Sequence, residues 1–142
     1  MKAPVRYQRK RTPGWKKPHK DVVNVGRPSM WGNPFHVKKT NVGAKKWSVL
    51  FQRDRYSNHV LVESYEHWID AMQAAVTLFD KWFDDSIADR GSDLWNFRQM
   101  YGWKGFTLCS AAKSLLRGKD VMCWCDPGDP CHGDVILRKV NS

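Results

Sequence analysis

Residues 121–137 read Val121-Met-Cys-Trp-Cys-Asp-Pro-Gly-Asp-Pro-Cys-His-Gly-Asp-Val-Ile-Leu137, and the rest of the chain is organised around them. The pattern predicts a short strand over 121–125, a tight turn over 126–129 and a helix that opens near Pro130. Two prolines and a glycine between acidic residues favour the turn. Asp129 is the expected N-cap, and Pro130 suits the first helical position, where its missing N–H costs nothing.

The predicted turn brings three cysteines and a histidine close together. Cys123 and Cys125 are two apart on the predicted strand, so their side chains point to the same side of it. Cys131 and His132 fall in the first helical turn, where unpaired N–H groups and the helix dipole favour an anion or a thiolate. The candidate catalytic residues are therefore Cys131 as nucleophile and His132 or Asp134 as acid or base.

The same stretch allows other chemistry. The spacing C-x-C-x5-C-H offers a tetrahedral zinc set of three thiolates and an imidazole, from Cys123, Cys125, Cys131 and His132. That spacing is unusual for zinc, because structural sites commonly pair their ligands through C-x2-C turns. A dithiol redox role is disfavoured, since closing C-x-C on a strand is strained. If this stretch has no chemical function, Cys123 is a small apolar core residue and the Cys-His pair only begins a helix.

A second candidate region follows the strand predicted at Val22–Val25. The next residues, Gly26-Arg-Pro-Ser-Met-Trp-Gly-Asn-Pro-Phe35, contain two glycines and two prolines that break regular structure. Such a loop lies at the carboxyl end of its strand, where open α/β sheets bind ligands. We expect it to face the Cys131–His132 helix start and to hold a nucleotide-like or phosphate-bearing ligand. The candidate ligand-binding residues are Asn24, Arg27, Ser29, Trp31, Asn33 and Cys125.

The net charge of +10 is unevenly distributed along the chain. Residues 1–20 contain eight Lys and Arg and no acid, whereas the remainder is close to neutral. This predicts a flexible basic arm over 1–20 and a single domain over 21–142. Basic arms commonly neutralise phosphates, so DNA or RNA is a candidate partner, although a solvated tail that aids solubility is the alternative. The candidate nucleic-acid contacts are Arg6, Arg9, Lys10, Arg11, Lys16 and Lys17.

The predicted fold class is α/β, with a short, mostly parallel sheet flanked by helices. A β-hairpin is expected as an insertion at 47–63, with strands at 47–51 and 59–62 after a polar loop over 38–46. Ser64 is expected to cap the clearest helix, whose apolar side chains recur at helical spacing from Tyr65 to Phe83. A shorter helix is expected over 110–116, ended by Gly118.

Composition also bounds the location of the protein. No apolar run approaches the roughly 18 residues of a membrane span, and the basic N-terminus lacks the apolar stretch of a secretory signal. Three of the four cysteines crowd into nine positions, whereas a disulfide framework would spread them. We therefore expect reduced thiols, a cytoplasmic location and no membrane partner.

Two motifs together resemble a family of phage and bacterial proteins classed as a domain of unknown function. They are Val22-Val-Asn-Val-Gly-Arg-Pro-Ser-Met-Trp-Gly-Asn-Pro-Phe35 and Arg117-Gly-Lys-Asp-Val-Met-Cys-Trp-Cys followed by Pro130-Cys-His-Gly-Asp-Val135, with a looser match over the Tyr65–Phe83 helix. The resemblance implies a compact α/β domain, often phage-encoded, with both motifs at one site and the basic arm outside the shared pattern. It names no reaction. An enzyme acting on a nucleotide-like ligand, a non-enzymatic phage effector that binds nucleic acid or a host protein, and a small zinc-binding domain all stay open.

Overall fold

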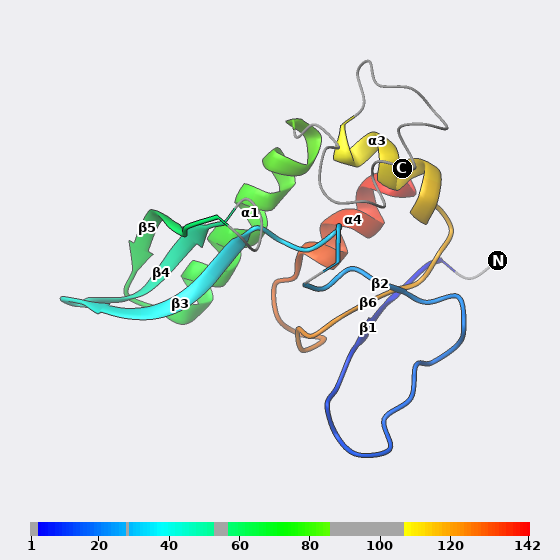
Figure 1. The fold of residues 1–142 in the computed structure, drawn as a ribbon, viewed down its shortest axis with the longest axis horizontal. Helices are drawn as coiled ribbons and strands as arrows, with labels where there is room; N and C mark the ends of the chain where they lie inside the picture. Colours follow the sequence, from blue (N-terminus) through cyan, green and yellow to red (C-terminus); the bar gives the residue numbers. More distant parts are fainter. Residues whose placement is uncertain (1–2, 28, 53–56, 86–106) are drawn as a thin grey trace.

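A computed structural model describes residues 3–27, 29–52, 57–85 and 107–142 of the chain. The described residues form two three-stranded sheets and three helices, so the predicted mixture of α and β structure is confirmed. The long helix α1 (Trp68–Asp85) lies between the antiparallel sheet and the two shorter helices (Figure 1). None of the described helices is long and apolar enough to cross a membrane.

The first sheet is parallel and has the order β1-β6-β2, with bounds β1 (Arg6–Gln8), β2 (Val23–Asn24) and β6 (Val121–Cys123). Tyr7 and Asn24 both lie opposite Met122, on either side of the central strand. All three residues of β6 are buried, as expected for a middle strand covered by helices. β6 ends at Cys123, two residues earlier than the sequence predicted.

The start of the chain differs from the flexible arm that the sequence predicted for residues 1–20. Arg6–Gln8 is an edge strand of the parallel sheet, and the backbone N–H of Val121 donates to the carbonyl of Val5 at 3.0 Å. The backbone N–H of Arg9 continues this pairing with the carbonyl of Cys123 at 2.7 Å. The basic segment at the start of the chain therefore contains a short strand. Its partner, β6, lies more than one hundred residues away in the sequence.

The second sheet is antiparallel and has the order β3-β4-β5, with bounds β3 (Phe35–Val42), β4 (Lys45–Phe51) and β5 (Val60–Tyr65). The predicted hairpin is confirmed as the β4–β5 pair, in which Phe51 lies opposite Val60; part of its connection, residues 53–56, lies outside the described residues. The prediction of a polar loop over 38–46 is wrong. Most of these residues belong to β3, to β4 and to the tight turn between them at Gly43, whose φ is +59°. Lysines are uncommon in strands but are tolerated where one face meets water.

The helix α1 begins later than the sequence predicted. Ser64 and Tyr65, expected as its cap and first apolar residue, end β5 instead, and α1 begins at Trp68. Its buried residues recur every four positions at Ala71, Ala75, Phe79 and Phe83. Small alanines at the N-terminal half allow the antiparallel sheet to pack closely on the helix, whereas the two phenylalanines fill the main core.

The other two helices are α3 (Leu108–Leu116) and α4 (His132–Val140). Thr107 caps α3 by accepting a hydrogen bond from the backbone N–H of Ser110, and Gly118 follows the helix with a φ of +78°, as the sequence predicted. α3, α4 and β6 close around the phenylalanines of α1 to form the main core. The core of the domain therefore lies directly under β6, the strand that carries Cys123.

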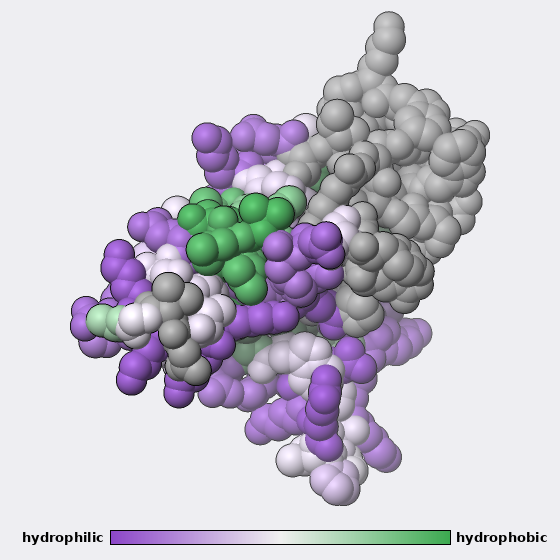
Figure 2. Space-filling view, turned by 60° about the vertical axis from the view of Figure 1, so that its left-hand side comes forward, coloured by the Kyte–Doolittle hydropathy of each residue, from purple (hydrophilic) through white to green (hydrophobic). Residues whose placement is uncertain are grey.

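Exposed apolar side chains gather on β5 and the start of α1. Figure 2 shows a hydrophobic patch on the side of the molecule that carries these elements. The exposed side chains there are Val60, Leu61, Val62, Trp68 and Ile69.

Candidate functional site

The helix α4 begins at a cysteine rather than at the predicted Asp129. Cys131 has the extended backbone of an N-cap, with φ −145° and ψ 137°, and its Sγ accepts a hydrogen bond from the backbone N–H of Gly133 at 3.4 Å. Asp129 and Pro130 remain in the turn before it, so their predicted cap and first-position roles are wrong. One of the backbone N–H groups left unpaired at the start of α4 thus donates to a sulfur of the chain itself.

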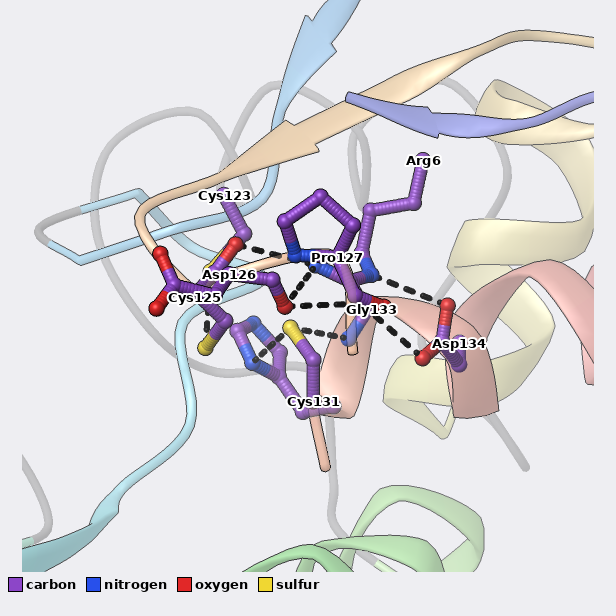
Figure 3. Close-up of polar contacts among 9 residues, drawn as sticks. Arg6, Cys123, Cys125, Asp126, Pro127, Cys131, Gly133 and Asp134 are labelled. Carbon is purple, nitrogen blue, oxygen red and sulfur yellow. Dashed lines mark hydrogen bonds and ion pairs between the residues drawn. The ribbon is translucent and has the colours of Figure 1, made fainter. Parts of the chain in front are cut away.

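Three thiols converge in front of this cap, as the sequence predicted (Figure 3). The sulfurs of Cys123, Cys125 and Cys131 all lie within 4.8 Å of one another, and those of Cys123 and Cys125 are 3.9 Å apart. Cys123 and Cys131 are buried and Cys125 is half-buried. Cys125 lies beyond the end of β6, so the turn, and not strand alternation, brings its sulfur to the cluster. We call these three residues the thiol cluster.

The pKa values of the three thiols in the cluster are shifted in different directions. Hydrogen bonds from Cys125 and then Cys131 lower the pKa of the Cys123 thiol. The hydrogen bond to Cys123 raises the pKa of Cys125 to about 11, and hydrogen bonds to Cys123 and Cys125 raise that of Cys131. Because thiolates bind metals, a bound cation would displace the protons that remain on the cluster.

His132 is buried beside the thiol cluster, with 5% of the residue exposed. Its Nε2 lies 2.7 Å from the carbonyl oxygen of Val25, and its ring packs edge-on against Phe79 at 5.0 Å between centroids. A carbonyl only accepts hydrogen bonds, so Nε2 must carry the proton and donate it. In the neutral ring Nδ1 is therefore unprotonated, and it lies 3.9 Å from the Sγ of Cys131.

Arg6 holds the turn that carries the thiol cluster. Its side chain is 5% exposed, and its guanidinium contacts both carboxylate oxygens of Asp134, with Nε 2.9 Å from Oδ1 and Nη2 3.3 Å from Oδ2. Nη1 also donates to the carbonyl of Cys125 at 3.2 Å, and Nη2 to that of Pro127 at 3.2 Å (Figure 3). Although burial lowers it, the hydrogen bond to Asp134 and the neighbouring thiols raise the pKa of Arg6 above its ordinary value.

These contacts change the expected roles of two residues. Arg6 was grouped with the candidate nucleic-acid contacts, but its guanidinium is enclosed and directed at the turn. Asp134, a candidate acid or base, is paired with Arg6 and does not line the neighbouring pocket. Nothing in the local sequence of Arg6 distinguishes it from the other basic residues near the N-terminus, so the sequence carried no signal for this role.

A pocket of about 150 Å³ joins the two regions that the sequence singled out. One wall comes from the loop after β2, through Arg27 and Asn33, and another from the thiol cluster, Trp124 and His132. The third wall was not predicted, since it depends on how α1 and β3 pack. Its residues are Phe35, Val37, Trp68, Met72, Ala75 and Val76.

Arg27 stands at the edge of this pocket. The residue is exposed, and its Nη1 donates to the carbonyl of Asn33 at 3.2 Å. Surrounding protein lowers the pKa of its guanidinium through desolvation. The aliphatic part of its side chain lies over Gly32, where a Cβ would come within 2.9 Å of the Arg27 Cγ.

Four other predicted ligand-binding residues have structural contacts or lie away from the pocket. The Asn33 side chain joins the loop to α1, because its Nδ2 donates to the carbonyl of Ala75 at 3.3 Å while its Oδ1 accepts from the N–H of Phe35 at 2.8 Å. The Oδ1 of Asn24 accepts from the N–H of Gly26 at 3.0 Å. Trp31 is buried in the main core, and Ser29 is absent from the pocket walls.

The remaining basic candidates lie on the loop that follows β1. Arg9 and Arg11 place their guanidinium carbons 4.6 and 4.7 Å from the ring centroid of Trp124. Lys10, Lys16 and Lys17 are exposed, and the Nζ of Lys17 donates to the carbonyl of Lys20 at 3.1 Å. Arg9 and Arg11 thus lie beside Trp124, which lines one wall of the pocket, although more than one hundred residues separate them from it in the sequence.

Comparison with known proteins agrees with the motif resemblance. No curated protein and no solved structure matches the chain. One family model matches residues 7–142, including most of the segment that the resemblance had left outside the shared pattern, and its description is Domain of unknown function (DUF4326). Since the match covers nearly the whole chain, the protein belongs to this family of uncharacterised domains.

Proposed function

We propose that this chain binds one zinc ion through Cys123, Cys125 and Cys131, with His132 as the fourth ligand. The observation that carries the proposal is the spacing of the three sulfurs, all within 4.8 Å of one another. A tetrahedral site with Zn–S bonds of about 2.3 Å places neighbouring sulfurs about 3.8 Å apart. The 3.9 Å between Cys123 and Cys125 fits that edge.

His132 has the second contact that zinc-binding histidines need. Such residues usually donate their other ring N–H to a carbonyl or carboxylate, which fixes the tautomer and the ring orientation. Here Nε2 donates to Val25 at 2.7 Å, so Nδ1, 3.9 Å from the Sγ of Cys131, is the nitrogen that would bind the metal, although only the three sulfurs, and not this nitrogen, all lie within 4.8 Å of one another. Three thiolates and one imidazole complete a tetrahedral shell, which favours a structural rather than a catalytic zinc.

The surroundings suit the charge of such a site. Zinc with three thiolates carries a net charge of about −1, which is costly to bury without nearby positive groups or hydrogen-bond donors. The backbone N–H of Gly133 already donates to the Sγ of Cys131 at 3.4 Å. Arg6 and Arg27 lie on two sides of the thiol cluster and supply positive charge.

Metal analysis of protein purified under reducing conditions tests this proposal. We expect one zinc per chain by non-denaturing mass spectrometry, lost on acidification, and tetrahedral ligand-field bands when cobalt replaces it. Cys123→Ser and Cys131→Ser should lose the metal. Cys109→Ser is the matched control, because Cys109 is a buried cysteine of α3 outside the cluster. Wild-type protein that has four free thiols and takes up no zinc would rule the proposal out.

A second candidate function concerns the pocket itself, and the observation that favours it is the position of Arg27 beside walls of apolar side chains. We propose that the pocket binds a nucleotide-like or phosphate-bearing small molecule, with an aromatic ring inside and the anionic group on Arg27. A cavity of about 150 Å³ encloses a ring the size of benzene. A base or similar ring therefore fits inside, and the rest of the molecule extends toward the edge.

Titration with adenosine monophosphate, adenosine and inorganic phosphate tests the pocket. We expect the monophosphate to raise the melting temperature more than either part alone. Arg27→Ala should weaken its binding at least tenfold, since one charge-assisted contact contributes about 1.5–3 kcal/mol. Arg27→Lys keeps the charge but not the two-point geometry, so it should retain part of the affinity. If a panel of nucleoside monophosphates with all common bases produces no shift, the pocket proposal fails while the zinc proposal still stands.

A further inference from the structure

We propose that the loop over residues 9–20, which contains all of the candidate nucleic-acid contacts except Arg6, forms together with Trp124 a binding surface for single-stranded nucleic acid. We call this surface the basic loop. It contains six of the 24 Lys and Arg of the chain and no Asp or Glu. The inference goes beyond the zinc site and the pocket, because neither the metal nor a small ligand is needed for it.

The basic loop is held in place at both ends. At its start, the backbone N–H of Arg9 donates to the carbonyl of Cys123 at 2.7 Å; at its end, the Nε2 of His19 lies 2.8 Å from the Oδ2 of Asp120. In between, a turn joins the N–H of Trp15 to the carbonyl of Thr12, with Gly14 at a φ of +84°. Figure 1 shows the loop as a projection beyond β1 and β2. An ordered surface loses less conformational entropy on binding than a flexible arm would.

Trp124 extends the surface toward the pocket. The guanidinium groups of Arg9 and Arg11 both lie over its indole ring within cation–π distance, which places two cations against one aromatic ring. Unpaired bases stack on aromatic and guanidinium planes, while neighbouring lysines neutralise the phosphates between them. Trp124 also lines the pocket. A single-stranded nucleic acid bound to the basic loop would therefore run along the edge of the pocket.

The observations favour a nucleic acid over a membrane. A loop that inserts into a lipid surface presents large apolar side chains to it. The exposed large apolar residues of the described chain lie elsewhere, at Val5, on β5, at the start of α1 and at Leu115, and none belongs to the basic loop. Trp15 is the largest apolar residue of the loop and is half-buried. Charge combined with an Arg–Trp group fits unpaired bases better than a duplex, whose bases are already stacked.

A matched pair of triple variants tests the proposal. Lys10→Ala, Arg11→Ala and Lys16→Ala together remove three charges from the basic loop. Lys81→Ala, Lys113→Ala and Lys119→Ala remove three exposed charges from α1, α3 and the connection between α3 and β6. Both proteins have the same net charge, so a difference between them reports position. The probe is a fluorescently labelled oligothymidine of about 20 nucleotides, measured by anisotropy over a series of salt concentrations, with the corresponding duplex as a comparison.

We expect the wild type to prefer the single strand, and the loop variant to bind it at least tenfold more weakly than the control variant. The slope of log K against log salt should fall by about 0.7 for each lost phosphate contact. Equal losses in both variants would mean that only net charge matters, and would overturn the proposal. So would equal binding of duplex and single strand, or loop-dependent binding to phosphatidylcholine–phosphatidylglycerol vesicles with no binding to the oligonucleotide.

Discussion

Arg6 and Asp134 are 128 residues apart in the chain and form an ion pair with two contacts, at 2.9 and 3.3 Å. The pair joins the first strand of the parallel sheet to the first turn of α4, and the same guanidinium donates to the carbonyl of Cys125. It therefore connects three segments on which the thiol cluster depends.

Replacing Arg6 with alanine should weaken zinc binding without removing a ligand. Loss of a residue that orients metal ligands typically reduces metal affinity by about 10- to 100-fold. Competition with a chromophoric zinc chelator measures the change. Arg138→Ala is the control, since it removes an equal charge from α4, where Arg138 forms an exposed pair with Asp80 of α1. If both variants bind zinc as the wild type does, Arg6 has no part in holding the turn.

Gly133→Ala should destabilise the protein even though alanine favours helices. In an ordinary helix interior this substitution stabilises by about 0.8–1 kcal/mol. Here a Cβ at position 133 would lie 2.9 Å from the Cδ of Arg6, in a side chain fixed by its hydrogen bonds. The new methyl group must displace the guanidinium, so urea unfolding should show a lower free energy of unfolding.

The same substitution in an Arg6→Ala background separates the two effects. With the long side chain gone, Gly133→Ala should become neutral or stabilising by up to about 1 kcal/mol. A double-mutant cycle with no coupling between the two positions would contradict the contact.

Removal of zinc should lower the melting temperature substantially. A ligand that binds only the folded state stabilises it by about 2.7 kcal/mol when its concentration is 100 times the Kd. For a chain of this size that corresponds to roughly 5–10 °C. Differential scanning calorimetry before and after dialysis against a chelator measures the shift, and zinc but not magnesium should restore it. An unchanged transition would show that the thiol cluster stabilises the fold without a metal.

His36 should make stability depend on pH between about 6.5 and 4. Desolvation, followed by the charges of Arg27, His59 and Lys38, lowers the pKa of His36 to about 4. As the pH falls, His36 is therefore protonated near pH 6.5 in the unfolded chain but only near pH 4 in the folded chain. The contribution of His36 is therefore complete above pH 6.5 and is lost as the pH falls toward 4.

Urea unfolding at a series of pH values tests this dependence. The variant His36→Gln should flatten the slope in that window, while His67→Gln, at an exposed position before α1, should leave it as in the wild type. Solvent reaches the half-buried His36, so the difference is expected to be modest. Identical slopes for His36→Gln and the wild type would contradict the prediction.

Local sequence patterns were enough to show which segments could form the site. Breaker residues after a buried strand, a C-x-C pair and a Cys-His pair at a helix start are local patterns, and local propensity is enough to place them on loops and at an element end. The strands β2 and β6 of the parallel sheet, the β4–β5 hairpin, the end of α3 and the convergence of three thiols follow from such patterns, whereas β1 does not. The resemblance to an uncharacterised family also rests on them.

The role of each side chain depends on contacts that only the folded chain makes. The proton on His132 is fixed by the carbonyl of Val25, 107 residues away, and the guanidinium of Arg6 is held by an ion pair with Asp134, 128 residues away. The pocket wall from α1 and the Arg9–Arg11–Trp124 group likewise depend on long-range packing. A basic residue reads the same in the sequence whether its guanidinium faces water or a buried turn. The difference arises from partners that the fold brings together, because burial and hydrogen bonding are properties of the space around a side chain.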